Sequence, residues 1–421
     1  MRLPFSRTIR KALGRPDPAA LAKRYAHLDA PSLVPIVSLA PTAAQRHLPR
    51  RITILLPGLR IAGATGGPNT AYNIGARLHG VGLRVRFVSI QNRLDDNLTQ
   101  LRAHVAQLGE LTDGAAAIDF ASWSEAVPLP VEPDESFLAT AWQTAYTAQA
   151  ALQHTTAREF YYLIQDYEPA FSAWSSNFAL AAATYTMPHR AIFNDPALRD
   201  YLYAQIPESR AAAPQHISFH PAVDGALFAP PAEPRSRPYL LLFYARPFAQ
   251  RNAFEIGLHA LRAAVSRDAL RAGEWEIRSI GAPLPAFDLG AGQTLINDPW
   301  RDFTSYAAQM RRASIAFALS ISPVSGYPVR EIASTGGFAV TNTFANKDLA
   351  SLRAISPRIF AAPATVDDMA TQLVHAATAV AAGEANTPLP PNASQMPPTW
   401  TTALSEVIPW IVAGVRESRD E

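Results

Sequence analysis

The sequence predicts an α/β protein with two domains, each built on a parallel β-sheet, and three observations support this. From residue 51 onward, short apolar segments alternate with amphipathic segments of helical period, which is typical of parallel sheets crossed by helices. The alternation stops at a proline-rich stretch, residues 228–238, and then restarts. The chain has 421 residues, 48% of them hydrophobic, which is enough for more than one core.

In the first half, a glycine-containing loop follows the first strand. It leads into a helix in which Ala71, Ile74 and Leu78 recur on one face. Asn194 is expected to be the N-cap of a helix that carries Leu198 and Leu202. Buried strands are predicted at residues 52–56, 83–90, 137–140, 160–164, 191–193 and 216–219.

In the second half, helices are expected from residue 252, at 303–312 and at 366–381. A second proline-rich stretch, residues 388–398, precedes a terminal helix with Trp400, Leu404, Ile408 and Ile411 on one stripe. The stiff segment 228–238 is interpreted as the connector between the domains. Strands are predicted at residues 239–244, 275–280, 315–319 and 338–341.

These elements predict four regions. Residues 1–50 form a basic N-terminal extension, 51–228 the first domain, 229–400 the second domain, and 401–421 a C-terminal helix that can cross back to the first domain. The first fifteen residues hold five arginines and lysines with apolar residues between them. They are either a short helix lying on an anionic membrane surface or a solvated terminus.

Composition excludes several classes of function. The formal net charge of +2 gives no reason to expect nucleic acid or another polyanion as partner. The absence of cysteine excludes disulfides, thiolate nucleophiles and cysteine zinc sites, and it fits a reducing compartment. His216 and His220 are closely spaced but have no carboxylate at ligand spacing, so a zinc site is not expected. No apolar run approaches the roughly 18 residues that cross a bilayer.

The segment 322–331 carries the most informative pattern of the chain. An apolar strand precedes it, and Pro328 suits the first position of a following helix, where a missing N–H is tolerated. Glu331 lies one turn into that helix, and Gly336 or Gly337 suits its left-handed end. Backbone N–H groups at such a helix start bind phosphate oxygens, and a carboxylate one turn in can accept hydrogen bonds from sugar hydroxyls. An ordinary crossover between strand and helix would give the same pattern.

Two arginines follow the first strand of the second half. Arg246 and Arg251 bracket the start of the next helix, where two guanidiniums beside a helix N-terminus suit a diphosphate. The alternative is a pair of ordinary surface arginines.

Two further loops follow strands of the first half. The loop 58–69 is neither a G-x-G-x-x-G nor a P-loop, but its small residues, with Gly66 and Gly67 before Asn69, let a ligand approach the backbone. Asp166 and Glu168 follow the strand 160–164, where either can act as a base for an attacking hydroxyl. A plain long turn and a turn before Pro169 are the alternatives. Ligands of open α/β sheets bind outside the carboxyl ends of the strands, so these loops are expected to share one cleft.

Taken together, the motifs resemble glycosyltransferases of the GT-B type. Arg246 matches the arginine of their Gly-Arg-Leu motif, and Arg251 stands at the place of the lysine five residues later. Residues 326–331 match the second half of their Glu-Gly-Phe-Gly-Leu-Pro-x-x-Glu motif, and residues 219–224 resemble the crossing between their domains. Residues 165–168, 244–247 and 326–328 more closely resemble the WsaF-type rhamnosyltransferases of bacterial surface glycan assembly.

The resemblance implies two Rossmann-like domains that face each other across a cleft. It also implies transfer of rhamnose from dTDP-rhamnose to a glycan or lipid-linked glycan acceptor, at the cytoplasmic side of the bacterial envelope. Peripheral contact with the inner face of the membrane would come from the basic N-terminus. No metal cofactor is expected, because arginines and a helix dipole can neutralise the leaving diphosphate.

Residue roles follow from the same resemblance. Arg246 and Arg251 would hold the diphosphate, and Glu331 a hydroxyl of the nucleotide's pentose. The segment of Ser325, Gly326 and Tyr327 would contact phosphate or donor sugar. The loop of Gly66, Gly67 and Asn69 would lie beside the donor phosphate and the acceptor, and Asp166 or Glu168 would be catalytic.

One position departs from the retaining pattern. Pro323 stands where retaining members have their first glutamate, so recognition of the donor sugar must differ. Retention or inversion of configuration stays open, because an inverting enzyme would need a base such as Asp166. The alternatives are a UDP- or GDP-sugar transferase of the same fold, and a non-catalytic nucleotide-sugar-binding subunit of a glycan assembly complex.

Overall fold

The computed structural model describes residues 23, 33–34, 36–61, 65–91, 94, 98–112, 114–122, 127–298, 302–387, 389 and 393–417. The basic segment at the start of the chain, and with it the interpretation as a membrane-surface helix, lies outside the described residues. Residues Val37–Glu421 form one compact unit that holds every element named below.

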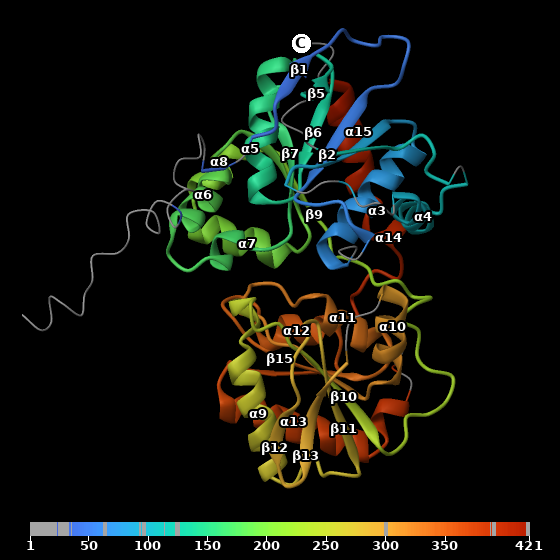
Figure 1. Cartoon of the computed structure of the whole chain (residues 1–421), viewed down its shortest axis with the longest axis vertical. Coiled ribbons are helices and arrows are strands. Elements are labelled where there is room, and N and C mark those ends of the chain that lie inside the picture. The colour runs from blue at the N-terminus through green and yellow to red at the C-terminus, as the bar shows by residue number, and fades with distance from the viewer. Residues whose placement is uncertain are drawn as a thin grey trace, which may run out of the picture. The chain divides into compact units, whose positions relative to one another are not determined.

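The first domain contains a seven-stranded sheet in which every neighbouring pair is parallel. Its strands β2, β6 and β7 are buried along their whole length. The sequence of β7 is accordingly a continuous run of apolar and aromatic residues, whereas β2 also carries the buried polar residues Arg51 and Thr53. In spatial order the strands are β4 (Asp119–Ser122), β3 (Arg84–Ser89), β2 (Arg51–Leu56), β6 (Ser136–Ala139), β7 (Phe160–Ile164), β8 (His189–Phe193) and β9 (His216–Ser218) (Figure 1).

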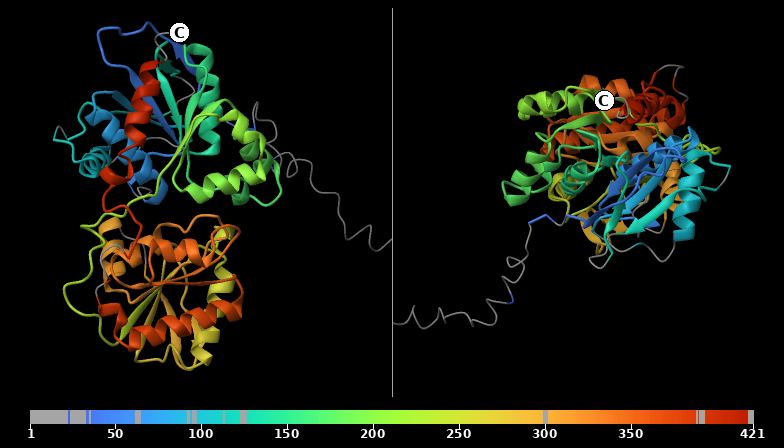
Figure 2. Two further views of the ribbon diagram at one scale, coloured as in Figure 1. Left: turned by 180° about the vertical axis from the view of Figure 1, so that it is seen from behind. Right: turned by 90° about the horizontal axis from the view of Figure 1, so that it is seen from above.

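Helices cover both faces of this sheet. Apolar residues of α3 (Gly66–Gly80), α4 (Leu98–Gly109) and α15 (Val407–Glu417) share one core with β2 and β3. Those of α5 (Trp142–Ala151) and α7 (Pro196–Gln205) share the core of the other face. The C-terminal helix α15, in red, returns to the first domain and packs on its sheet (Figure 2). The Tyr161 hydroxyl of β7 donates a 3.1 Å hydrogen bond to the Ile411 carbonyl of this helix. Smaller elements complete this domain: β1 (Leu39–Pro41), which pairs with β5 (Leu129–Val131), α6 (Ser176–Thr184), α8 (Glu208–Ala212) and α14 (Trp400–Ala403).

The second domain has the same architecture, a seven-stranded sheet with helices on both faces. Its core on one face is formed with α9 (Phe254–Ser266) and α13 (Val366–Ala381), and on the other with α10 (Phe303–Arg312), α11 (Tyr327–Ser334) and α12 (Leu349–Ile355). All strand pairs are parallel except the hairpin of β12 and β13 at one edge. In spatial order the strands are β12 (Phe287–Gly290), β13 (Gln293–Asn297), β11 (Trp275–Ile280), β10 (Tyr239–Tyr244), β14 (Ile315–Phe317), β15 (Phe338–Asn342) and β16 (Ile359–Ala362).

Several predicted elements have the bounds that the sequence indicated, and others needed correction. The strands at 160–164, 239–244 and 275–280 and the helices at 303–312 and 366–381 are confirmed. The predicted N-cap Asn194 is wrong: Asp195 caps α7, because its Oδ1 accepts from the Ala197 N–H at 2.9 Å directly before the helix. Pro328 occupies the second helical position, since Tyr327 begins α11. The expected terminal helix is divided into α14 and α15.

The segment between the two sheets is anchored on the second one. Phe228 is buried against two aromatic rings of α10, at centroid distances of 5.7 and 6.1 Å. Arg235 is also buried, and its guanidinium donates to three backbone carbonyls, those of Ala313 at 2.6 Å, Thr335 at 2.7 Å and Ala385 at 2.9 Å. A buried guanidinium needs such acceptors because it cannot lose its charge.

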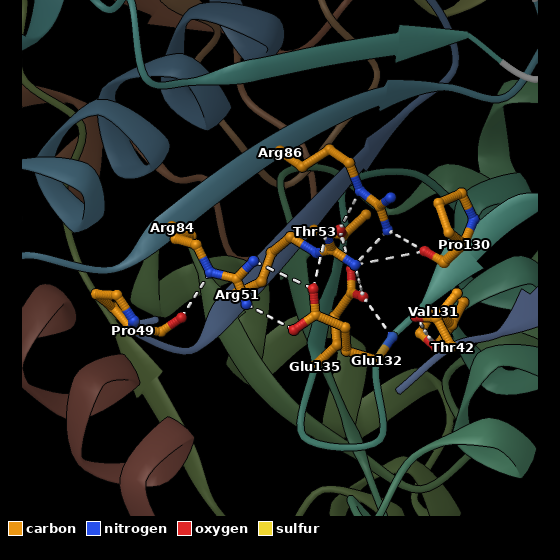
Figure 3. A network of polar contacts seen from close by, with 10 residues as sticks. All are labelled: Thr42, Pro49, Arg51, Thr53, Arg84, Arg86, Pro130, Val131, Glu132 and Glu135. Atoms are coloured by element: carbon orange, nitrogen blue, oxygen red, sulfur yellow. Dashed lines mark hydrogen bonds and ion pairs between the residues drawn. The ribbon is translucent and has the colours of Figure 1, made fainter. Parts of the chain in front are cut away.

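A network of buried charges lies at the amino ends of β2 and β3 (Figure 3). Glu135 pairs with Arg51 at 2.7 Å and with Arg86 at 2.6 Å, and Glu132 pairs with Arg84 at 2.6 Å. Buried charges are tolerated only when paired in this way. The network is at the edge opposite to the carboxyl ends of the strands, so it holds the sheet together and is not part of the pocket described next.

Candidate active site

A pocket of about 770 Å³ opens at the carboxyl ends of both sheets. In the first sheet the strand order reverses between β2 and β6, and in the second between β10 and β14. Crevices at such switch points are where open α/β sheets bind ligands. Residues after all four strands line the pocket, among them Pro57, Thr140, Arg246 and Ala318.

The two predicted diphosphate arginines both line this pocket. The guanidinium of Arg246 lies 5.4 Å from the Phe248 ring and donates a 3.3 Å hydrogen bond to the Tyr244 hydroxyl. Gly281, at φ +114°, gives Arg246 room, because a Cβ there would come within 3.1 Å of its Cγ. None of the ion pairs between described residues involves Arg246. A positive charge in a pocket is therefore left for a ligand to neutralise.

Arg251 lies close to both an aromatic ring and a carboxylate. It belongs to a short 3₁₀ helix, Gln250–Asn252, and its guanidinium lies 3.9 Å from the centre of the Phe171 ring. Its Nε is 3.6 Å from Oδ2 of Asp166. A diphosphate that binds Arg251 would compete with this carboxylate.

The loop before α11 contributes backbone and one carboxyl. Gly326 is the N-cap of α11 with φ 72°, a conformation that favours glycine, and Ser325, Gly326 and Tyr327 all line the pocket. Ser325 accepts a 3.2 Å hydrogen bond from Nε of Arg330. Glu331 is buried at the pocket wall and accepts a 2.5 Å hydrogen bond from the Tyr306 hydroxyl. Burial raises the pKa of Glu331 to about 7, while that hydrogen bond opposes the shift.

The glycine loop of the first domain meets the same segment. Gly66 and Gly67 line the pocket at the start of α3. Gly66 has φ +41°, and a Cβ there would come within 3.2 Å of the Tyr327 ring, so only glycine fits. The Tyr327 hydroxyl lies 2.5 Å from Oγ1 of Thr70. The two loops that the sequence singled out therefore touch across the pocket.

Asp166 and Glu168 also line the pocket, and their surroundings differ. Asp166 accepts a 2.5 Å hydrogen bond from the Ser322 hydroxyl, and burial raises its pKa although Ser322 and Arg251 favour the carboxylate. Glu168 accepts a 2.5 Å hydrogen bond from the Trp142 N–H at the start of α5. Burial, followed by the nearby charge of Asp166, raises the pKa of Glu168 to about 8.

One predicted site residue is turned away. Asn69 is buried, and its Oδ1 lies 2.8 Å from Nε2 of His104 on α4, so it does not line the pocket. The Asn69 side chain therefore joins two helices, and the place of its loop beside the donor phosphate and the acceptor stays a prediction. Its position two residues after Gly67 on α3 directs it to the neighbouring helix.

Sequence reasoning missed several pocket residues. Phe171, Phe303 and Tyr306 line the pocket, but each has the apolar or helical spacing of an ordinary core residue. Lys347 was also missed. It is 2% exposed, donates a 2.7 Å hydrogen bond to the Ser320 carbonyl near Asp166, and burial lowers its pKa to about 7. A lone lysine in a loop gives no signal in the sequence.

No group of three His, Asp or Glu in the described parts of the chain could hold a metal ion. The absence of a metal requirement stays a prediction. Of the helices that the structure describes, none combines the length and the apolar character needed to cross a membrane.

The two parallel sheets and the pocket at their switch points define the class of fold: the chain has the GT-B fold, with two Rossmann-like domains, as the sequence predicted. More particularly, it belongs to the WsaF family. The model of the WsaF N-terminal domain matches residues 51–195 and that of the WsaF C-terminal domain matches residues 239–374, together more than half of the chain.

Comparison with individual proteins agrees with this assignment. The chain is 40% identical over 151 residues to the O-antigen biosynthesis protein RfbC of Myxococcus xanthus. That match covers 34% of this chain and only 11% of RfbC, so the chain spans a small part of its relative.

Solved structures share the fold. Sucrose-phosphate synthase of Thermosynechococcus elongatus matches with a TM-score of 0.56 at 11% identity, over 87% of this chain and 98% of that one. HepE of Anabaena, solved in complex with UDP, matches with a TM-score of 0.55 at 12% identity, over 88% of this chain and all of that one.

Proposed function

We propose that this protein transfers a sugar from a nucleoside diphosphate sugar, with dTDP-rhamnose as the donor, to a carbohydrate acceptor in bacterial surface glycan synthesis. The observation that carries the proposal is the position of Arg246, a cation without a carboxylate partner among the described residues, in a pocket at the switch points of both sheets. The name of RfbC, an O-antigen biosynthesis protein, supports the acceptor class, and the WsaF resemblance supports the donor.

Three arginines line the proposed donor site. Arg246 and Arg251 project from the second domain, and Arg60 comes from the loop after β2 in the first. Charge-assisted hydrogen bonds from guanidinium to phosphate neutralise the charge that develops on a leaving diphosphate. Glu331 is assigned to a pentose hydroxyl, since it lines the same pocket as Arg246 and Gly326.

Asp166 is assigned as the base that deprotonates the acceptor hydroxyl, if configuration is inverted. Its raised pKa brings it closer to the range in which a carboxylate can accept a proton near neutral pH. Glu168 is a weaker candidate for that role, because its carboxyl already caps the first turn of α5 through the Trp142 N–H.

The test is calorimetric titration of dTDP, UDP and GDP, with chelator present, into the wild type and the Arg246→Ala variant. Loss of one charge-assisted contact of about 1.5–3 kcal/mol weakens binding about 10- to 150-fold. Arg353→Ala is the matched control, because it removes the same charge from an exposed position of α12 outside the pocket. Unchanged affinity in Arg246→Ala would contradict the assigned role.

Binding alone does not separate an enzyme from a nucleotide-sugar-binding subunit. A second measurement follows release of dTDP from dTDP-rhamnose with and without an acceptor glycan. Release that depends on acceptor supports the transferase. Tight dTDP binding with no release under any acceptor supports the binding subunit, and preference for UDP or GDP moves the proposal to another donor.

A further inference from the structure

An aromatic pair of an exposed tryptophan and a half-buried phenylalanine lies close in the chain to a pocket residue of the first domain. Trp174 is 91% exposed, and its ring stacks on that of Phe178 with centroids 5.1 Å apart and an interplanar angle of 19°. The backbone of Trp174 has φ 21°, a positive value that residues with a side chain rarely adopt. Exposing so large an apolar ring is unfavourable in water, and such patches commonly mark binding sites.

The pair is continuous with the proposed active site. Phe171 lines the pocket beneath the Arg251 guanidinium, and Trp174 follows it by three residues. Three residues of extended chain span at most about 11 Å, so the Trp174 backbone lies within that distance of the pocket wall. The same short loop carries Glu168 at its start, in the 3₁₀ helix Glu168–Phe171.

The chain segment that carries the pair has no charged side chain. No Asp, Glu, Lys or Arg occurs between Glu168 and His189. Exposed hydroxyl and amide side chains flank the rings, among them Ser176 and Asn177. Because the segment adds no lysine or arginine around the rings, it lacks the basic cluster by which proteins bind anionic lipid headgroups, which favours a neutral partner.

We propose that Trp174 and Phe178 form a platform on which a neutral sugar ring of the acceptor glycan stacks, one or two rings away from the reacting hydroxyl. The C–H bonds on one face of a pyranose ring carry partial positive charge, which suits the negative face of an indole. Neighbouring hydroxyl and amide groups can bond the sugar's hydroxyls. This inference rests on the proposed function, and it adds a subsite for the acceptor.

The experiment titrates a series of neutral rhamno-oligosaccharides of increasing length into the wild type, Trp174→Ala and Trp174→Phe, with dTDP bound. The expected result is that the affinity for the longer oligosaccharides falls about tenfold in Trp174→Ala, as for loss of one stacked ring. Trp174→Phe keeps most of the affinity, and the monosaccharide is bound equally by all three. Because Trp174 is almost fully exposed, its replacement leaves the melting temperature unchanged, which is checked in parallel.

Ile296→Ala, which shortens a 47% exposed apolar side chain on β13, is the control for a general loss of surface apolarity. Equal oligosaccharide binding by wild type and Trp174→Ala overturns the platform, and so does a wild type that binds no member of the series. Binding to phosphatidylglycerol vesicles that is lost in Trp174→Ala overturns it in favour of a lipid surface. The affinity for dTDP, measured separately on each protein, tests the proposed function and not the platform.

Discussion

Replacing Glu331 with glutamine is expected to make the protein more stable above neutral pH while weakening nucleotide binding. Glu331 is 4% exposed and accepts its hydrogen bond from the Tyr306 hydroxyl at 2.5 Å. Burial raises its pKa from 4.5 to about 7. Glutamine has the same size, and its Oε1 can accept the same hydrogen bond without a charge.

The size and sign of the effect follow from the pKa. Because the folded protein holds this proton more tightly than the unfolded chain, the group stabilises the fold below pH 4.5, and that contribution is lost as the pH rises from 4.5 to about 7. A rise of this size corresponds to about 3 kcal/mol. The free energy of unfolding of Glu331→Gln, relative to wild type, should therefore increase by about 3 kcal/mol between pH 4.5 and pH 8.

The assay is urea denaturation of both proteins across this pH range, followed by fluorescence. Glu255→Gln, at an exposed position in the first turn of α9, is the control and should leave the pH dependence as in wild type. Parallel pH profiles for wild type and Glu331→Gln would refute the reasoning. In the same samples dTDP should bind Glu331→Gln about tenfold more weakly, since a carboxylate accepts a pentose hydroxyl better than an amide does.

Three further predictions concern other parts of the chain. Asp166→Asn should slow sugar transfer by a factor of about 100 or more in a product-release assay, because the proposed base is lost. The same variant should bind dTDP at least as tightly as wild type, because the Asp166 carboxylate, 3.6 Å from Arg251, no longer competes with the diphosphate. Arg86→Met should lower the free energy of unfolding by about 3–5 kcal/mol, measured by denaturation, because Glu135 keeps its buried charge with one partner fewer. Gly257→Ala should cost about 1–3 kcal/mol in the same assay, since its Cβ would lie 2.4 Å from a buried phenylalanine ring of β10.

Each of the three has a result that would contradict it. Weaker dTDP binding by Asp166→Asn would mean that the Asp166 carboxylate positions Arg251 for the diphosphate and does not compete with it. A near-neutral Arg86→Met would mean that Glu135 is solvated or protonated. Gly225→Ala is the control for Gly257→Ala, because the nearest atom to its Cβ is 3.9 Å away, and equal stability of the two variants would refute the packing argument.

The fold was predicted well where local pattern and burial agree. The strand β7 and the helix α13 have the predicted bounds. A short apolar run is buried most completely as a strand inside a sheet, and apolar residues with a period of 3.6 are buried together only when the segment is a helix. The hairpin of β12 and β13 was missed because its strands are short and partly exposed, and Gly290 and Gly292 flank the turn between them. Such edge strands are fixed by pairing with a neighbour and not by their own periodicity.

Part of the lining of the pocket could also be predicted from the sequence, while the roles of its residues stay predictions. The sequence by itself determined which loops carry chemistry, because charged and small residues after an apolar strand must lie at the carboxyl edge of a parallel sheet. Arg246, Asp166 and Glu331 were found in this way, and all three line the pocket.

Only the tertiary structure decided how those loops meet and which side chains face the pocket. Asn69 belongs to the same loop as Gly67 but bonds to α4, whereas Phe171 has the pattern of an ordinary core residue and yet lines the pocket. Lys347 has no local pattern and is buried, with its ammonium group bonded to the carbonyl of the pocket residue Ser320. The physical reason is that the direction of a side chain and its pKa depend on what packs against it from distant parts of the chain, and local sequence carries no record of those neighbours.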